Sequence, residues 1–332
     1  MIEIPGYRIV RTLGQGGMAT VYLAIQESFE REVALKILSG DLAKGSTFSE
    51  RFLREAKIVS RLVHPNIVTV YDVGIEAGQH FLSMEYIPGA DLKQVRSKLS
   101  LLERLDTIKD IARALSFSGK KGYVHRDVKP ENIMLHADSG RAVLMDFGIA
   151  RPSETASSMT QTGTAIGTPH YMSPEQARGL VVDSRSDLYS LGIVLFLMLT
   201  GFVPFDGDSA VAVGIKHVSE PTPRLPTYLQ AFQGIINKIL SKDPEHRYQT
   251  GDELIAALDA LPPYTLAEVA EWESAQEHDG EGLDVEIDAD AGTLVGQKSV
   301  EPLAPVSRSP ETEISLSRED RVAYQEEEKS SL

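Results

Sequence analysis

A glycine-rich stretch near the N-terminus has the composition of a phosphate-binding loop. It reads LGQGGMATVY, with three glycines in four positions, and glycine lets a backbone approach a ligand closely. A Walker A loop needs Gly-Lys-Ser/Thr after its glycines and a Rossmann turn opens into a helix, whereas this loop opens into a strand-like run. The stretch fits the strand–loop–strand pattern G-x-G-x-x-G-x-V through Gly14, Gly16 and Val21, with Ala19 as the third small residue. A tight hairpin without a ligand is the alternative for this loop alone.

A lysine and a glutamate farther along the chain predict an ion pair near this loop. Lys36 lies in the strand-like run VALK, where alternation places it on the same face as Ala34. Glu55 falls at helical spacing with Phe52 and Val59, on an apolar stripe where an unpaired acid costs several kcal/mol. We therefore expect Glu55 to bind Lys36, which would hold the ammonium where it can contact nucleotide phosphates. A solvated Lys36 is the alternative.

The chain is expected to consist of a β-rich segment, which carries the glycine loop and Lys36, followed by a helical segment. Apolar residues alternate between residues 7 and 86, as in half-buried strands, and one helix, 48–63, interrupts them. Pro88-Gly89 marks a joint, after which the apolar runs have helical spacing. We expect an α+β fold with two lobes, a β-rich N-lobe over residues 1–86 and a helical C-lobe over residues 87–263. The helical runs lie near residues 101–115, 188–199, 232–240 and 252–261.

Composition and charge exclude several classes of protein. The 332 residues contain no cysteine, which excludes disulfides, thiolate metal sites and cysteine nucleophiles and suits a reducing cytoplasm. No signal sequence opens the chain, and its longest apolar run, 191–199, is too short to span a membrane, so we expect a cytoplasmic protein without a membrane anchor. Residues 264–332 hold 18 acidic and 5 basic residues, so the folded part is nearly neutral and has no concentrated basic field for nucleic acid.

Two further motifs complete a known pattern. The stretch HRDVKPEN covers residues 125–132 and DFG covers residues 146–148, and both follow the glycine loop, Lys36 and Glu55 in order. With these motifs the chain resembles the eukaryotic-type Ser/Thr protein kinases of bacteria over about residues 7–262. The resemblance implies the bilobal protein-kinase-like fold and ATP-dependent phosphorylation of Ser/Thr in protein substrates, with Mg²⁺ or Mn²⁺ as the metal. Residues 264–332 are then an acidic, mostly disordered tail, apart from one short helix from Thr265 to Gln276.

The resemblance assigns roles to the polar residues of the two motifs. Asp127 would accept the proton of the substrate hydroxyl or orient that hydroxyl, and Lys129 would contact the γ-phosphate and favour Ser/Thr substrates. Asn132 and Asp146 would bind the metal, since oxygen ligands suit a hard ion. Taken singly, Asp127 and Asn132 could equally belong to a capped turn and Asp146 to a plain strand end, but these alternatives do not explain the ordered set.

The resemblance also implies an adenine pocket, for which ordinary core packing is the alternative. Met84 would stand at its gate, the backbone of Glu85 and Tyr86 would connect the lobes, and Asp91 would contact the ribose or cap a helix. The ATP-binding residues implied in this way are Leu13, Gly14, Gln15, Gly16, Gly17, Met18, Ala19, Val21, Ala34, Lys36, Met84, Glu85, Tyr86 and Met134.

A hydroxyl-rich segment between the DFG motif and the SPE motif, Ser173 to Glu175, resembles an activation segment. Residues 153–168 hold eight serines and threonines, and Arg126, next to Asp127, would bind a phosphate there. We expect autophosphorylation at Thr160 and Thr162, with Ser157, Ser158 and Thr164 as alternatives, and contact of Thr168 with the substrate groove. A low-complexity linker is the alternative. Two structural roles follow from the resemblance: Asp187 would anchor the catalytic loop, and Arg247 would pair with Glu175.

Two other functions and several partners stay open. A pseudokinase acting as an interaction scaffold would normally lack Lys36, Asp127, Asn132 or Asp146, and this chain has all four. A small-molecule kinase would not need the peptide groove implied by residues 167–175. The acidic stretch 268–290 could dock on a basic surface, and the tail could be phosphorylated at Thr293, Ser309 or Thr312. A cognate phosphatase and forkhead-associated-domain proteins are possible partners.

Overall fold

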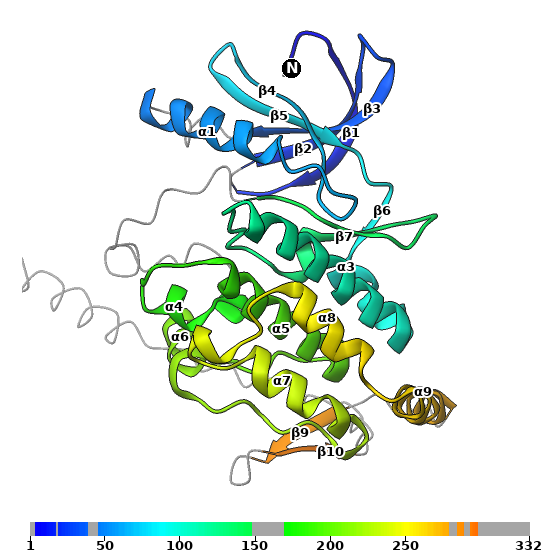
Figure 1. Ribbon diagram of the computed structural model, residues 1–332. Helices are drawn as coiled ribbons and strands as arrows, with labels where there is room; N and C mark the ends of the chain where they lie inside the picture. The colour runs from blue at the N-terminus through cyan, green and yellow to red at the C-terminus, as the bar shows by residue number, and fades with distance from the viewer. Residues whose placement is uncertain are drawn as a thin grey trace, which may run out of the picture. The chain divides into compact units, whose positions relative to one another are not determined.

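The N-terminal lobe is built on a five-stranded antiparallel sheet (Figure 1). The computed structural model describes residues 4–17, 19–38, 46–147, 169–278, 284–288 and 293–297. The strand order in the sheet is β1-β2-β3-β5-β4. The strands are β1 Tyr7–Gln15, β2 Ala19–Gln26, β3 Arg31–Leu38, β4 Val70–Glu76 and β5 Gln79–Glu85.

Both faces of this sheet are apolar at its centre, because β3 carries apolar residues on both sides. Val33, Leu35 and Ile37 pack with Phe81 in a small cluster on one face. Ala34 faces the other way and joins the main core, which also receives the apolar stripe of helix α1 (Ser46–Val59). The predicted helix and the predicted alternation are therefore both present, and Figure 1 shows α1 lying beside the sheet.

A small three-stranded sheet follows the joint between the lobes. It has the order β6-β7-β8, formed by β6 (Gly89–Asp91), β7 (Ile133–His136) and β8 (Ala142–Leu144). Gly89 has φ of 150°, and a Cβ there would lie 1.9 Å from the carbonyl oxygen of Leu135. Only glycine therefore permits this strand pairing.

The C-terminal lobe is helical, as predicted. Its helices are α2 Leu92–Val95, α3 Leu101–Lys120, α4 Pro174–Ala177, α5 Ser184–Thr200, α6 Ala210–Ser219, α7 Gln233–Ile239, α8 Gly251–Asp259 and α9 Pro263–His278. Short 3₁₀ turns, named η, occur at η1 Arg96–Lys98, η2 Pro130–Asn132, η3 Pro169–Tyr171, η4 Thr227–Phe232 and η5 Pro244–His246. A hairpin of β9 (Asp284–Asp288) and β10 (Thr293–Gln297) follows α9 in the sequence.

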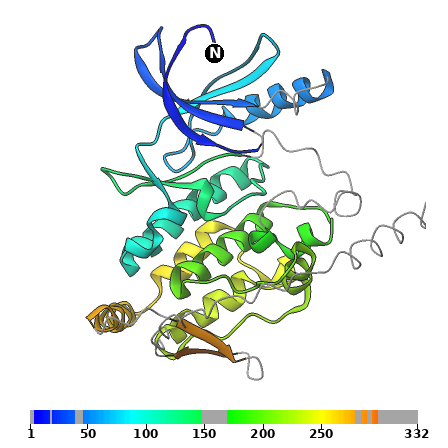
Figure 2. The same ribbon diagram turned by 180° about the vertical axis from the view of Figure 1, so that it is seen from behind.

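Helix α5 forms the centre of this lobe. Every residue from Ser186 to Thr200 is buried, which explains why the stretch is apolar on all sides rather than amphipathic. Helix α3 packs against both α5 and α8, as Figure 2 shows from behind. At the α3–α5 contact, a Cβ on Gly119 would lie 2.9 Å from the Cβ of Ser184. The absence of a side chain at residue 119 therefore allows this close helix approach.

Helix α9 continues the folded structure past the predicted lobe boundary at residue 263. Val269 is 1% exposed, and the indole of Trp272 stacks on the ring of Tyr228 with centroids 3.6 Å apart. Glu273 forms a bidentate ion pair with Arg104 of α3, at 2.8 and 3.0 Å. The helix expected over 265–276 is therefore present, and it packs on the C-lobe. No helix among the described residues is long and apolar enough to cross a membrane.

Candidate active site

The glycine loop is a tight turn between β1 and β2. Gly14 pairs with Val21 and Gln15 pairs with Thr20 across the two strands. The amide of Gly16 donates to the carbonyl of Ala19 at 2.9 Å, which closes the turn. The strand–loop–strand arrangement predicted from the sequence is therefore present. Met18, predicted to belong to the ATP site, lies outside the described residues.

The glycines of this loop provide space rather than unusual backbone angles. Gly14, Gly16 and Gly17 all lie outside the left-handed region, and a Cβ on Gly14 or Gly17 would meet no atom within 4 Å. A side chain at these positions would instead occupy the open volume beside the loop. The loop therefore leaves its backbone accessible to a ligand the size of a phosphate.

Five residues of the predicted adenine pocket belong to the apolar core that the two lobes share. Ala34 and Met84 are directly opposite each other on β3 and β5 and are 4% and 3% exposed. Leu13, Val21 and Met134 are partly buried and pack against the same core. This apolar surface joins one lobe to the other, because Met134 lies on β7.

The connection after β5 is fixed through a side chain that points to the C-lobe. Glu85 accepts from Arg141 at 3.0 Å, and one of its oxygens also accepts from the amide of Thr69 at 3.4 Å. The hydroxyl of the next residue, Tyr86, accepts from Arg11 at 3.4 Å. Asp91 accepts from the amide of Gln94 and caps α2, as the capping alternative predicted.

Lys36 binds Asp146 rather than its predicted partner. Its ammonium lies 2.6 Å from Oδ1 of Asp146, and among the described residues this is the ion pair that it makes. Glu55 is half-buried on α1 and lies close enough to Tyr123 to help burial raise the pKa of that phenol to about 12. The predicted Lys36–Glu55 pair is therefore not among the ion pairs of the described residues, in which the ammonium contacts Asp146 instead.

The charge of Asp146 depends on this contact. Burial alone would raise the pKa of its carboxyl, but the attraction and hydrogen bond of Lys36 outweigh burial and lower the pKa below its usual value. Asp146 also has φ of 49°, in the left-handed region that is unfavourable for residues other than glycine. Strained backbone of this kind persists where the surrounding structure holds it, often at functional sites.

The loop from residue 125 to 132 brings the predicted catalytic residues together. The amide nitrogen of Asn132 donates to the main-chain oxygen of Asp127 at 2.8 Å and to its carboxylate at 3.0 Å. Lys129 lies 3.1 Å from the same carboxylate oxygen. The backbone amide of Met145 donates to the carbonyl of Asn132 at 2.8 Å, which places Asp146 beside this loop. Asp127, Lys129, Asn132 and Asp146 therefore form one cluster.

Asp187 anchors this loop, as predicted. Its two carboxylate oxygens accept from the backbone amides of His125 and Arg126, both at 2.7 Å. Arg126 has φ of 65°, so the two bonds hold a strained backbone immediately before Asp127. Burial raises the pKa of Asp187 to about 7, and the two amide donors oppose that rise.

His125 is a central residue that the sequence did not reveal as such. Its Nε2 lies 2.7 Å from the carbonyl oxygen of Met145, and its ring meets that of Phe147 with centroids 4.6 Å apart. The amide of Asp127 donates to Nδ1 of the same ring at 3.2 Å. His125 therefore joins the two motifs, and its place directly before Arg126 and Asp127 was the available signal.

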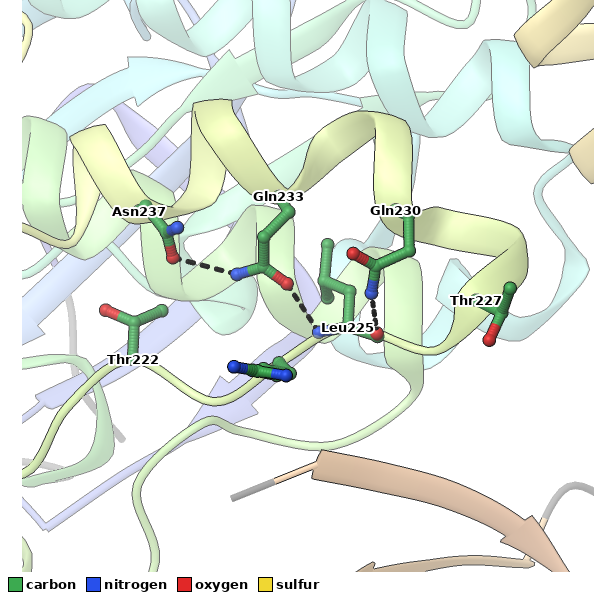
Figure 3. Close-up of a pocket in the computed structure, with 7 residues that line it drawn as sticks. Thr222, Leu225, Thr227, Gln230, Gln233 and Asn237 are labelled. Carbon is green, nitrogen blue, oxygen red and sulfur yellow. Dashed lines mark hydrogen bonds between the residues drawn. The ribbon is translucent and has the colours of Figure 1, made fainter. Parts of the chain in front are cut away.

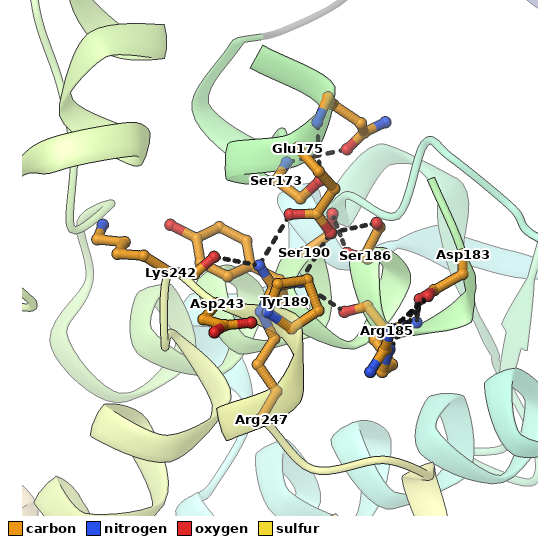
Figure 4. A network of polar contacts seen from close by, with 12 residues as sticks. Ser173, Glu175, Asp183, Arg185, Ser186, Tyr189, Ser190, Lys242, Asp243 and Arg247 are labelled. Atoms are coloured by element: carbon orange, nitrogen blue, oxygen red, sulfur yellow. Dashed lines mark hydrogen bonds and ion pairs between the residues drawn. The ribbon is translucent and has the colours of Figure 1, made fainter. Parts of the chain in front are cut away.

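Arg247 and Glu175 form the buried pair that was predicted. The guanidinium donates to both carboxylate oxygens at 2.8 Å, and the Arg247 side chain is 0% exposed (Figure 4). Its other donors bind the carbonyl oxygens of Ser241, Arg185 and Lys242, so all five N–H groups are used.

The protonation state of Glu175 follows from these contacts. Burial would raise the pKa of its carboxyl, but hydrogen bonds from Arg247 and Ser186 outweigh burial and lower the pKa below its usual value. The carboxylate is therefore charged, and it ties the SPE motif to α5 and to the segment before α8. Gln176 donates to the carbonyl of Arg126 at 3.1 Å, which links this region to the catalytic loop.

The remaining predicted positions fall outside the described residues. These are Thr160, Thr162 and Thr168, the other candidate phosphosites of residues 153–168, and Gly148 of the DFG motif.

The cluster could hold part of a metal coordination shell. Because Asn132 uses its amide nitrogen toward Asp127, its amide oxygen remains, and Asp146 has a second carboxylate oxygen beyond the one bound to Lys36. The described residues contain no group of three or more His, Cys, Asp or Glu side chains that could hold a metal. These two oxygen ligands therefore fit a hard cation that takes its remaining ligands from water and phosphates.

Comparisons with known proteins agree with this geometry. A family model described as a protein kinase domain matches residues 7–256. The serine/threonine-protein kinase PrkC of Bacillus subtilis is 43% identical over 257 residues, covering 75% of this chain and 39% of that protein. PknB of Mycobacterium leprae is 44% identical over 263 residues, covering 76% of this chain and 42% of that protein. The matching part thus spans about two fifths of the length of these curated relatives.

Solved structures show the same fold. The PknI kinase domain of Mycobacterium tuberculosis is similar with a TM-score of 0.63 and 29% identity, covering 79% of this chain and 98% of that domain. A point mutant of the same domain is similar with a TM-score of 0.62 and 30% identity, covering 78% of this chain and 96% of that domain.

Proposed function

Because the chain belongs to the protein kinase family, we propose that it transfers the γ-phosphoryl group of ATP to serine and threonine hydroxyls of proteins. One observation carries the proposal: Lys36, Asp127, Asn132 and Asp146 are all present and are joined by short hydrogen bonds. Phosphoryl transfer depends mainly on positioning and on compensation of negative charge, which such a cluster can provide.

The proposed active site has the parts that a nucleotide requires. The apolar surface of Ala34, Met84 and Met134 suits a flat base, and the open glycine loop suits a phosphate chain. Lys36 supplies a positive charge near both the apolar surface and the glycine loop. Its present partner, Asp146, would share that charge with the nucleotide phosphates.

Asn132 and Asp146 would hold a Mg²⁺ or Mn²⁺ ion. Bound there, such an ion would neutralise charge that develops on the phosphate oxygens. Asp146 is suited to this role because its carboxyl pKa is lowered, so the carboxylate is charged at neutral pH.

Asp127 would act on the attacking hydroxyl. One of its oxygens is held by Asn132 and Lys129, which fixes the carboxylate, and from this position it would accept the hydroxyl proton or orient the hydroxyl. Lys129 would in turn balance charge on the transferred group. The lysine at this position and the relatives named as serine/threonine kinases support an alcohol rather than a phenol as acceptor.

We also propose that activity is switched by autophosphorylation at Thr160 or Thr162. Arg126 supports this proposal, because a guanidinium beside Asp127 can transmit a phosphate contact directly to the catalytic loop. Thr168 would contribute to the substrate groove. A cytoplasmic location, a cognate phosphatase and forkhead-associated-domain partners remain predictions from the sequence.

The experiment is incubation of the purified full chain with Mg-ATP, followed by phosphosite mapping, with Lys36→Met treated identically. Phosphate on Thr160 or Thr162 in the unaltered chain alone would support both the activity and its switch. If the chain binds ATP but transfers no phosphate to itself or to a generic protein substrate, the result would favour the pseudokinase scaffold.

A further inference from the structure

A polar pocket lies in the C-lobe among residues that the proposed active site does not use. It lies between the segment before η4 and the helix α7 and has a volume of about 450 Å³ (Figure 3). A water molecule occupies about 30 Å³, so the pocket could hold several side chains of a peptide. Its lining residues are Thr222, Arg224, Leu225, Thr227, Gln230, Gln233 and Asn237.

The hydrogen bonds within the pocket leave some of its polar groups without a partner. Gln233 accepts from the amide of Leu225 at 2.6 Å and donates to Oδ1 of Asn237 at 2.8 Å (Figure 3). Gln230 donates to the carbonyl of Leu225. Among the described residues, the amide nitrogen of Asn237, Oε1 of Gln230 and the hydroxyls of the lining threonines make no other hydrogen bond and remain available to a ligand.

The charge of the pocket is positive. Arg224 is exposed and, within the described part of the chain, has no carboxylate within ion-pair distance, while no lining residue is acidic. An arginine fork beside amide and hydroxyl donors suits carboxylate groups. The ligand class that fits is therefore an acidic peptide segment.

The chain itself contains such a segment, part of which is the strand β9. Residues 279–290 carry six acidic residues and no basic residue. They follow directly after α9, and α9 is fixed to η4 by the stacking of Trp272 on Tyr228. The adjacent η4 residues Thr227 and Gln230 line the pocket. The acidic segment is thus covalently joined to a helix that packs on η4, and this linkage raises its effective concentration at the pocket.

We propose that this pocket is the docking site for the acidic segment 279–290 of the same chain. Carboxylates of the segment bind Arg224 and the free donors of Asn237 and the threonines. The docking does not depend on kinase activity, so it can be tested independently of the proposed function.

The test uses the full chain with a photoreactive p-benzoylphenylalanine in place of Thr227, which is exposed and lines the pocket. The same probe in place of Val181, which is 95% exposed elsewhere on the C-lobe, is the control. Illumination and peptide mapping should give crosslinks to residues 279–290 from position 227 only. Isotope-labelled and unlabelled chains are mixed so that crosslinks within one chain and between two copies have different masses.

Two variants sharpen the test. Arg224→Glu should lower the crosslink yield by about tenfold or more, the loss expected for a charge-assisted hydrogen bond, whereas Arg178→Glu on an exposed site should not. Replacing Asp284, Glu286 and Asp288 by their amides should have the effect of Arg224→Glu without altering the pocket. The proposal would be overturned if position 227 crosslinked to the segment no more strongly than position 181 does. It would also be overturned if the yield were unchanged in both variants, or if crosslinks formed only between two copies.

Discussion

The ammonium of Lys36 lies 2.6 Å from the carboxylate of Asp146, although 110 positions separate the two residues in the sequence. The contact joins β3 of the N-lobe to the DFG motif that follows β8. It favours the ionised form of Asp146, a half-buried residue whose carboxyl pKa would be raised by burial alone. The lysine thus controls the charge of the residue that we propose as the metal ligand.

Replacing Lys36 by methionine should abolish most of the activity without unfolding the protein. We expect the autophosphorylation rate to fall by about 10²–10³-fold, as when one positioned electrostatic donor is lost. The pKa of Asp146 should rise, because its stabilising cation is gone. Lys57→Met, at an exposed position of α1, is the matched control. Equal rates in Lys36→Met and the control would contradict the assigned role.

Asp127→Asn tests the proposed catalytic carboxylate. Turnover should fall by about 10²–10⁴-fold, the usual contribution of a positioned acid–base group. ATP affinity should change little, because the residue faces the acceptor hydroxyl rather than the base of the nucleotide. Steady-state kinetics with a generic protein substrate would measure the first effect and equilibrium titration with ATP the second, with the exposed Asp106→Asn as control. Unchanged turnover would refute the mechanism.

The sequence predicted those features that depend on local pattern or on a whole motif. The alternation of β3 placed Ala34 in the core, and helical spacing placed α1 correctly apart from its ends. The partner of Lys36 was predicted wrongly, because it depends on how α1 lies relative to β3, and no local pattern specifies that position. The position of each acid in the fold, rather than its residue type, determines that Lys36 pairs with Asp146 and not with Glu55.

Other features were invisible in the sequence because they join distant segments. The stacking of Trp272 on Tyr228 connects residues 44 positions apart, on elements whose packing only the folded lobe defines. The polar pocket likewise depends on which amide oxygens of Gln233 and Asn237 are already used. His125 could have been anticipated as structural, but its contact with Phe147 required the fold.

The Arg247–Glu175 pair should be strongly coupled. Arg247→Met leaves the Glu175 carboxylate buried and unpaired, so we expect a loss of about 3–5 kcal/mol in the free energy of unfolding. Adding Glu175→Leu should recover much of this loss, because the double variant has no buried charge. Denaturant unfolding measures both, with the exposed Arg178→Met as control. Simple additivity of the two single losses would contradict the coupling.

Trp272→Ala tests whether α9 stabilises the catalytic lobe, although the helix lies beyond residue 256, where the family match ends. We expect a loss of about 1–3 kcal/mol, since the substitution removes both apolar burial and the aromatic stack on Tyr228. The exposed neighbour Glu271 provides the control, as Glu271→Ala should change the unfolding midpoint little. Identical midpoints for the two variants would mean that the stack of Trp272 on Tyr228 contributes no stability.

The last prediction concerns a buried histidine that should make stability depend on pH. His217 is 0% exposed, with Nδ1 3.0 Å from the hydroxyl of Tyr189 and Nε2 without a hydrogen-bond partner among the described residues. Burial, with the nearby charge of Lys242, lowers its pKa to about 3; His170 also lies near the ring, and its charged form would add to this effect. On unfolding, the pKa returns to about 6.5, so the unfolded chain binds one more proton between these values.

Stability contributed by His217 is therefore fully present above pH 6.5 and is lost as the pH falls toward 3. Between pH 7 and pH 5 the loss should reach about 2 kcal/mol, since one proton contributes about 1.4 kcal/mol per pH unit. His217→Gln keeps an acceptor for Tyr189 but cannot titrate, so its unfolding free energy should fall less steeply over this range. His246→Gln, whose side chain is 76% exposed in the native protein, should retain the slope of the unaltered chain. Urea unfolding at closely spaced pH values gives these slopes directly, and parallel curves for all three proteins would show that His217 is not the group responsible.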